Sequence, residues 1–383
     1  MRKLRTVMVL LFGVLLIAAS CASDTTDDGT SGTSAAPTTE GGTDSPDAPP
    51  DTGVTTDTVE LTQDGDSTLD SVKNAGEVKC GTRDALPGFA VLQDDGSHQG
   101  FDSDFCRVIA AAVLGDAEAH EFIDLETADR FTALQGGEID VLVRNTTWTA
   151  GRDGLEGATF VQPNFYDGQG MMVAADAGFA SIDDMDDTVI CSAGGTTNEG
   201  NVAVEFQRRG LALNDVLSFE NTDLLQEAFQ NDRCDGWTSD VSQLTGLRST
   251  YPDGPEALVI LPEVFSKEPL APAVRDGDTA WAQAVNWAVF ATIQAEEYGM
   301  DSSNVDSFLT SEDPNILKFL GVEVDGTVLD PGLGLPTDFA YQVVSQVGNY
   351  SEIFEEHLAP LGLQRGVNEL WNNGGILYAP PYK

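Results

Sequence analysis

The sequence predicts an α/β protein with two similar lobes, and three observations support this prediction. The segment at 133–145 (ALQGGEIDVLVRN) is echoed at 228–240 (AFQNDRCDGWTSD), with Ala, Gln and Asp at matching places. Each copy has the pattern of a helix end, a polar turn and a strand. Earlier in each half, at 78–81 and 189–192, stands another matched strand that leads into a glycine-containing loop. Strands that alternate with helices at this spacing indicate parallel sheets.

The beginning of the chain predicts export. Basic residues precede an apolar run at 7–19 that is too short for an ordinary membrane span. Small residues then lead to Cys21, so we expect a lipoprotein signal peptide at 1–20 and a lipid anchor on Cys21; ordinary cleavage to a secreted protein is the alternative. Two acyl chains on one residue would give a stable membrane anchor.

Residues 21–67 are expected to form a disordered acidic tether, because they contain no Lys or Arg and hardly any large apolar side chain. The rest is long enough for two domains. We assign 68–167 and 277–383 to the first lobe and 168–276 to the second. Glycines near Asp167-Gly168 and Asp276-Gly277 mark the expected crossings between the lobes, where the backbone could rotate.

The composition argues against several kinds of partner. The chain has 63 acidic and 19 basic residues, a formal charge of −44, which disfavours nucleic acid and anionic lipid as partners. We expect a solvated acidic surface; an acidic patch for a cationic partner is the alternative. A monomer without metal or cofactor is expected.

Four further cysteines favour disulfides over zinc, because the chain has no CxxC pair and only three scattered histidines. The two-lobe organisation favours one bridge inside each lobe, Cys80 with Cys106 and Cys191 with Cys234. A bridge between the lobes remains the alternative. Asp102 or Ser103 is expected to cap the helix that holds Cys106.

Ligands of open α/β sheets bind at the carboxyl ends of strands, so the loops there are the candidate site. After the first strand, Leu86 and Phe89 could form an apolar wall, although Phe89 could equally be core. Arg152, with Thr147, could grip a carboxylate, unless it only caps a helix at the surface. In the other half, the loop at 194–199 suits an anion, and Asp240 could receive an ammonium group, so Arg152 and Asp240 would clamp a zwitterion.

Several long segments of the chain resemble the family 3 extracellular solute-binding proteins, and within them the general L-amino acid-binding proteins of polar amino acid ABC transporters. The resemblance is carried by 80–89 (CGTRDALPGF), 100–116 (GFDSDFCRVIAAAVLGD), 129–149 (DRFTALQGGEIDVLVRNTTWT), 165–173 (FYDGQGMMV), 193–199 (AGGTTNE), 267–278 (KEPLAPAVRDGD), 346–355 (QVGNYSEIFE) and 370–381 (LWNNGGILYAPP). It implies a periplasmic-binding-protein-like (Venus flytrap) fold, an extracytoplasmic location and an ABC permease as partner.

The resemblance also implies roles for particular residues. Arg152 would bind the ligand's α-carboxylate, and Asp240 its α-ammonium. The other implied contacts are Thr147, Thr196, Thr197 and Asn145. Leu86 stands where the family commonly has an aromatic residue, and Arg83 where it often has an acidic one, so we expect broad L-amino acid specificity.

Two other functions remain open on the same fold: a dehydratase-like enzyme and an amino acid sensor. No histidine lies in a predicted ligand loop, which disfavours acid–base catalysis. A sensor would need a second membrane segment or a signalling domain. Transport binding is therefore the expected function.

Overall fold

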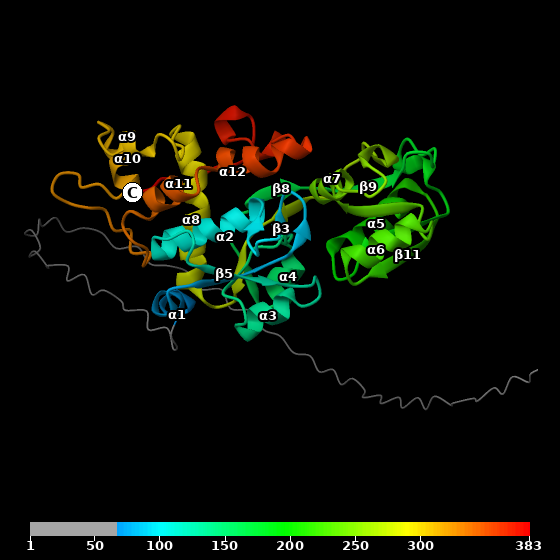
Figure 1. Cartoon of the computed structure of the whole chain (residues 1–383), viewed down its shortest axis with the longest axis horizontal. Coiled ribbons are helices and arrows are strands. Elements are labelled where there is room, and N and C mark those ends of the chain that lie inside the picture. Colours follow the sequence, from blue (N-terminus) through cyan, green and yellow to red (C-terminus); the bar gives the residue numbers. More distant parts are fainter. Residues whose placement is uncertain (1–66) are drawn as a thin grey trace, which may run out of the picture. The chain divides into compact units, whose positions relative to one another are not determined.

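The computed structural model describes residues 67–383. The predicted signal peptide, Cys21 and the predicted tether up to residue 66 lie outside the described residues. Within them, two lobes each contain their own five-stranded sheet (Figure 1). The strands of the first sheet, in spatial order, are β5 (His120–Asp124), β1 (Val78–Thr82), β6 (Val141–Leu142), β15 (Ala273–Arg275) and β7 (Ala158–Phe160). Those of the second are β11 (Leu213–Phe219), β10 (Thr188–Ala193), β12 (Gly236–Asp240), β9 (Gln169–Ala174) and β13 (Leu258–Ile260).

The two sheets have the same wiring. In each, one strand lies between two others and pairs with both in parallel: β1 between β5 and β6, and β10 between β11 and β12. In each, the fourth strand in spatial order is antiparallel and comes directly from the other lobe: β9 enters the second lobe and β15 returns to the first. The two-lobed α/β prediction is confirmed, and the antiparallel strands are an addition that follows from the chain crossing twice.

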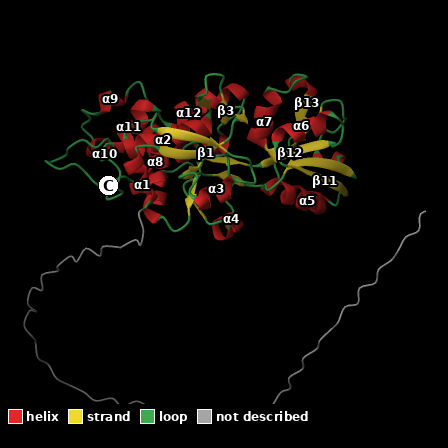
Figure 2. Ribbon diagram, turned by 60° about the horizontal axis from the view of Figure 1, so that its bottom comes forward, coloured by secondary structure: helices red, strands yellow, loops and turns green. Residues whose placement is uncertain are grey.

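Helices cover both faces of each sheet (Figure 2). The first lobe contains α1 (Thr68–Ala75), α2 (Phe101–Leu114), α3 (Arg130–Gly136), α4 (Ala150–Leu155), α8 (Thr279–Glu297), α9 (Val305–Phe308), α10 (Pro314–Phe319), α11 (Phe339–Gln346) and α12 (Tyr350–His357). The second contains α5 (Thr197–Arg209), α6 (Thr222–Gln230) and α7 (Val241–Ser249). Val141 and Leu142, adjacent on β6, enter different hydrophobic clusters, as strand alternation requires when both faces are buried.

Two small sheets complete the structure. A three-stranded sheet, β2 (Ala85–Leu86), β3 (Ala90–Leu92) and β4 (His98–Gln99), follows β1, and a two-stranded sheet pairs β8 (Phe165–Asp167) with β14 (Glu268–Leu270). Short 3₁₀ turns occur at Ile182–Asp184, Pro255–Ala257, Ala359–Leu361, Gly366–Asn368 and Trp371–Asn373.

The β8–β14 pair is where the chain crosses between the lobes. The predicted crossing at Asp167-Gly168 coincides with the step from β8 to β9. Gly168 is needed there for space, because a Cβ would overlap the Val264 side chain and lie 2.9 Å from the Ser266 carbonyl oxygen. The second predicted crossing is wrong: Asp276-Gly277 follows β15, already a strand of the first sheet, and the return crossing is at β14.

The prediction that Asp102 or Ser103 caps the helix that holds Cys106 is wrong, because the helix begins earlier, at Phe101. Gly100 is its N-cap, at φ 140°, and no side chain caps it. A Cβ at Gly100 would overlap the Phe89 carbonyl group, so only glycine fits. The carboxylate of Asp102 instead accepts a hydrogen bond from the Asn145 N–H at 2.7 Å.

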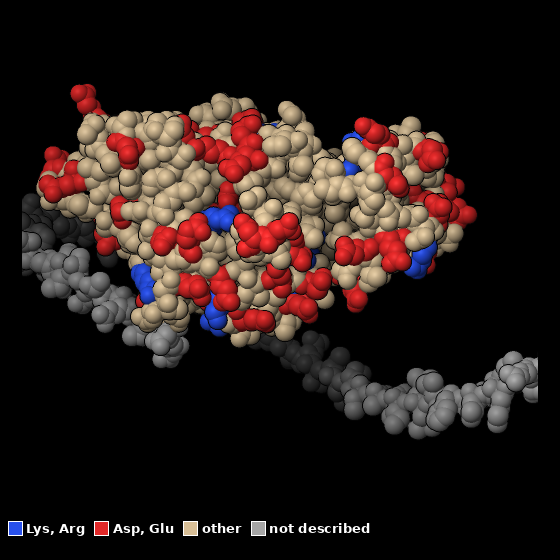
Figure 3. Space-filling view, in the orientation of Figure 1, with Lys and Arg blue, Asp and Glu red and all other residues tan. Residues whose placement is uncertain are grey.

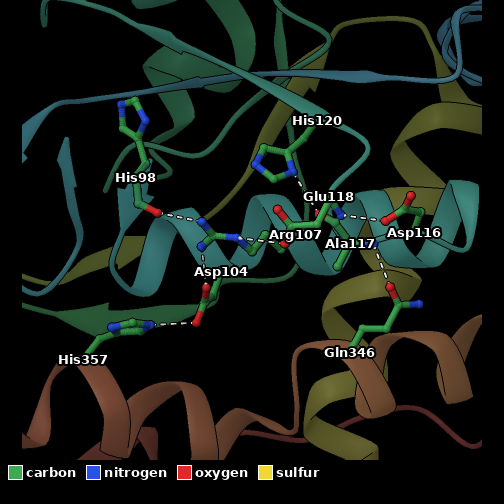
Figure 4. A network of polar contacts seen from close by, with 9 residues as sticks. All are labelled: His98, Asp104, Arg107, Asp116, Ala117, Glu118, His120, Gln346 and His357. Carbon is green, nitrogen blue, oxygen red and sulfur yellow. Dashed lines mark hydrogen bonds and ion pairs between the residues drawn. The ribbon is translucent and has the colours of Figure 1, made fainter. Parts of the chain in front are cut away.

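A polar network attaches the C-terminal helices to α2 (Figure 4). One carboxylate oxygen of Asp104 on α2 lies 2.7 Å from Nη1 of Arg107. The other lies 2.6 Å from Nε2 of His357 on α12. The N–H of Ala117 donates to Gln346 of α11 at 2.9 Å. Although Glu356 is close enough to complete a three-residue metal group with Asp104 and His357, both oxygens of Asp104 already have protein partners, so the network is structural.

Both disulfide predictions are confirmed. Cys80 on β1 is bonded to Cys106 on α2, with Cα atoms 6.1 Å apart, and Cys191 on β10 to Cys234, with Cα atoms 5.6 Å apart. Each bridge joins parts of one lobe, so neither restricts the lobes relative to each other. Within the described residues, no helix combines the length and apolar character that crossing a membrane requires.

Removing either disulfide is expected to lower the free energy of unfolding, because each one closes a loop in the unfolded chain. The sequence separations of 26 and 43 residues correspond to losses of about 3.5 and about 4 kcal/mol. Urea unfolding of Cys80→Ala/Cys106→Ala and of Cys191→Ala/Cys234→Ala, each against the oxidised wild type, measures these losses. An unfolding free energy that is unchanged in both double variants would contradict the expectation.

Candidate ligand-binding site

A cavity of about 220 Å³ is lined by both lobes at the carboxyl ends of their strands. The first lobe contributes Arg83, Arg130, Arg144, Asn145, Thr147 and Arg152, among others. The second contributes Thr196, Thr197, Asn198, Asn221, Thr222 and Asp240, among others. The placement agrees with the general position of ligand sites in open α/β sheets.

Arg152 lies in the first turns of α4, where the Thr149 side chain caps the helix by accepting from the Arg152 N–H at 3.1 Å. Its guanidinium donates to the Thr147 carbonyl oxygen at 2.8 Å and reaches the Gly195 carbonyl oxygen of the second lobe at 3.5 Å. Burial lowers the pKa of Arg152, with Glu268 and Asp240 acting in the opposite direction. Arg152 lines the cavity rather than only capping a helix.

Asp240 ends β12 and is 4% exposed. Its Oδ1 atom has no hydrogen-bond partner in the described part of the chain. Burial raises the pKa of Asp240 well above its usual value, and the negative charges of Asp167 and Glu268 raise it further. A buried oxygen without a partner in a cavity wall is a position that a cationic ligand group would stabilise.

The predicted hydroxyl contacts are placed in the cavity, but their hydroxyl protons have other acceptors. Thr197 donates to Glu268 at 3.0 Å, and Thr196 donates to the Ala193 carbonyl oxygen at 2.7 Å. Both residues stand at the beginning of α5, the 13-residue helix of the second lobe. The backbone N–H groups of its first turn and the positive end of the helix dipole remain suited to an anion.

Asn145 holds the two lobes and the first-lobe loops together. It has φ 35°, a left-handed conformation that is uncommon outside glycine and often found at functional sites. Its side-chain amide donates to Gln243 of α7 at 3.1 Å and accepts from Arg83 at 3.3 Å. Arg83 also donates to Thr222 of the second lobe at 3.3 Å. Cavity residues themselves therefore bridge the two lobes.

The expected apolar wall is absent from the cavity. Leu86 and Phe89 are fully buried and do not line it. Phe89 packs edge-on against Phe101 and Phe165, with ring centroids 5.9 and 5.7 Å apart. Phe89 lies in the turn between β2 and β3, which places its side chain in the core. Burial of an aromatic side chain stabilises a fold by roughly 1.5–3 kcal/mol, which favours this placement over the cavity wall. Arg83, which was predicted as a ligand contact, does line the cavity, together with Asp84 and Ala85.

Arg130 and Arg144 are cavity residues that the sequence analysis did not assign. Arg130 is 3% exposed, donates to the Gly195 carbonyl oxygen at 3.2 Å, and leaves its Nε without a partner in the described residues. Arg144 is 5% exposed. Arg144 follows the end of β6 as Arg83 follows the end of β1. This position after a strand could have identified Arg144 as a cavity residue from the sequence.

The cavity has a larger share of positive charge than the surface. Asp and Glu far outnumber Lys and Arg on the face shown in Figure 3, whereas four arginines and five carboxylates line the cavity; the carboxylates are Asp84, Asp124, Glu126, Asp223 and Asp240. The three histidines are all described and none lines it.

Sequence comparison identifies relatives over most of the chain. Residues 78–300 match the profile of bacterial extracellular solute-binding proteins, family 3. The general L-amino acid-binding periplasmic protein AapJ of Rhizobium johnstonii is 46% identical over 315 residues, which cover 82% of this chain and 92% of that protein. The glutamate/glutamine/aspartate/asparagine-binding protein BztA of Rhodobacter capsulatus is 42% identical over 316 residues, with the same two coverages.

A solved structure agrees with these matches. An ABC transporter periplasmic binding protein from Brucella ovis, solved with glutathione bound, superposes with a TM-score of 0.80 at 42% sequence identity. The match covers 83% of this chain and 100% of that chain. The two-lobed fold, the matched profile and the relatives together show that the chain belongs to the bacterial extracellular solute-binding proteins of family 3.

Proposed function

We propose that the protein captures free L-amino acids between its lobes and delivers them to the permease of an ABC transporter. The observation that carries the proposal is the pairing of Arg152 with Asp240 around one cavity: a half-buried guanidinium without a carboxylate ion-pair partner in the described residues, and a buried carboxyl group with an oxygen left unbonded.

The two groups match the two charged ends of an amino acid. The Arg152 guanidinium presents parallel N–H donors that can hold both oxygens of an α-carboxylate. The first turn of α5, beginning at Thr197, offers further backbone donors from the second lobe. Asp240, with one free oxygen, would accept from the α-ammonium group. A bound zwitterion would thus place its carboxylate against the Arg152 guanidinium and its ammonium group against Asp240.

Lobe closure follows from where these groups lie. Arg152 belongs to the first lobe, and α5 and Asp240 to the second, so a ligand held by all three favours the closed arrangement. The β8–β14 crossings connect the lobes. Closure would exclude water from the cavity, and interactions between charges are stronger in such a water-excluded environment. The closed pair of lobes would be the form presented to the permease.

The relatives support the ligand class. AapJ is named for general L-amino acids and BztA for four acidic and amide amino acids. The Brucella protein holds glutathione, whose γ-glutamyl group also bears a free α-amino and an α-carboxyl group. Broad specificity rests on the name of AapJ alone, because the apolar wall that favoured it is absent.

Lipid anchoring at Cys21 belongs to the same proposal. Its support is the apolar run at 7–19 and the small residues before the cysteine. The dehydratase-like alternative receives no support from the relatives, which are named as binding proteins. Incubation with prephenate or arogenate, with product formation as readout, tests it directly.

A thermal-shift screen of the twenty amino acids tests the proposed function. A ligand present at a hundredfold excess over its Kd should stabilise the folded protein by about 2.7 kcal/mol. Arg152→Ala should abolish the shift for every ligand, because the α-carboxylate is common to all. Arg248→Ala, at an arginine of α7 outside the cavity, is the matched control and should keep the shifts. If no amino acid stabilises the wild type, the proposal is wrong.

The affinity is expected to fall as the pH is lowered through the raised pKa of Asp240. Burial and the charges of Asp167 and Glu268 raise this pKa, so Asp240 takes up a proton at a higher pH than an ordinary carboxyl group, and the ammonium group of the ligand must displace that proton. Below this raised pKa, the affinity should weaken by up to about tenfold for each pH unit.

Calorimetric titrations at pH 8 and pH 5.5 measure this effect. Asp240→Asn keeps the shape of the side chain but cannot ionise, so it should bind more weakly at pH 8 and show little change with pH. An equally steep pH dependence in Asp240→Asn would show that another group is responsible.

A further inference from the structure

Three arginines remain in the cavity after Arg152 has been assigned to the α-carboxylate. Arg83, Arg130 and Arg144 are 8%, 3% and 5% exposed. None of them is within 4.0 Å of a carboxylate oxygen in the part of the chain that the structure describes. Burying a guanidinium without a charge partner is costly, so three such residues in one cavity call for an explanation.

Arg83 and Arg144 have spare donors. Arg83 makes two hydrogen bonds, both of 3.3 Å and both to neutral acceptors. Arg144 donates to the Leu125 carbonyl oxygen at 2.8 Å and to the Thr127 hydroxyl at 3.1 Å. A guanidinium carries five N–H donors, so neither side chain is saturated by these bonds. Burial, and then the charge of Arg83, lower the pKa of Arg144 to about 9.

The cavity carries charges of both signs. Asp240 is influenced most, among charged groups, by Asp167 and Glu268 from the β8–β14 crossings. Asp102, Asp84 and Glu126 act on both Arg83 and Arg144. Asp84 and Glu126 are exposed, so solvent screens their charges. Asp102 is buried, already accepts from the Asn145 N–H, and has a pKa that burial raises to about 7. None of the three forms an ion pair with either guanidinium.

We propose that Arg83 and Arg144, with Arg130 beside them, hold a second carboxylate of the ligand, so that the preferred substrate is an α-amino acid with an additional acidic group. This inference rests on the proposed function, since Arg152 and Asp240 must hold the main-chain groups. Free acidic amino acids and γ-glutamyl peptides share this chemistry.

The arrangement discriminates against neutral ligands in two ways. A ligand without the second carboxylate leaves Arg83 and Arg144 buried and unpaired. A ligand with an amide in place of the second carboxylate has only one acceptor oxygen there, and its NH2 group places donors against the N–H donors of the guanidiniums. Sites that are built to bond a polar group reject the analogue that lacks it far more strongly than an apolar pocket rejects a missing methylene.

Calorimetric titration of the purified full-length protein tests the proposal. L-glutamate or L-aspartate is expected to bind at least about tenfold more tightly than L-glutamine or L-asparagine, a difference of about 1.4 kcal/mol. Glutathione forms a third arm. Binding tighter than that of the acidic amino acids would assign the second carboxylate to a γ-glutamyl peptide, and weaker binding would assign it to a free amino acid.

Arg83→Gln then links the preference to the cavity. The variant should lose most of the glutamate-to-glutamine preference, because its affinity for glutamate falls much further than its affinity for glutamine. Arg83→Lys, which keeps the positive charge, should restore the preference. Arg248→Gln is the matched control and should behave like the wild type. If Arg83→Gln does not fold, Arg144→Gln is used instead, and its ratio of glutamate to glutamine affinity is compared with the ratio of the wild type. A ratio as large as that of the wild type would contradict the second-carboxylate site.

The failures are distinguishable. Equal affinities for glutamate and glutamine in the wild type would overturn the second-carboxylate site and leave amino acid binding intact. Absence of binding by every amino acid and by glutathione would overturn the proposed function itself.

Discussion

The cost of burying unpaired charge is the constraint on which this structure depends. Arg83, Arg130 and Arg144 are buried in the wall of one cavity between the lobes without an ion pair in the described residues, and one carboxyl oxygen of buried Asp240 lacks a protein partner. A fold optimised only for stability would replace such groups with apolar side chains, because buried charges rarely repay their desolvation. Their presence indicates that the missing partners come from outside the chain, and that the protein reaches its lowest free energy with ligand bound.

The rest of the fold serves to keep these charges in place. Each lobe has the same strand order and its own disulfide, so each is rigid by itself. The covalent links between the lobes are only the two crossings at β8 and β14. The remaining interlobe contacts named above are hydrogen bonds by Arg83, Arg130, Asn145 and Arg152. Since cavity residues make these bonds, occupation of the cavity and lobe closure are coupled.

The sequence allowed the prediction of features that follow from local pattern or from strand position. The echo between 133–145 and 228–240 predicted two similarly wired lobes, and that wiring selected the disulfides. Arg152 and Asp240 were found because each lies at or beyond the carboxyl end of a predicted strand; in the structure Asp240 ends β12, and Arg152 is in α4, after β6. Leu86 and Phe89 also follow a strand, and there the inference failed. Whether an apolar side chain faces a cavity or the core depends on tertiary packing around Phe101 and Phe165, which strand position alone does not specify.

The strongly acidic chain and the arginine-lined cavity are compatible because the charges act over different distances. Most carboxylates of the described residues lie on exposed side chains, whose fields fall off over roughly 8–10 Å at physiological ionic strength. Three of the four cavity arginines are buried, where screening is weaker and hydrogen bonds are directional. An anionic ligand would therefore meet some repulsion during approach but a dense set of N–H donors once inside. Surface charge would affect its association rate, whereas the buried arginines would determine its affinity.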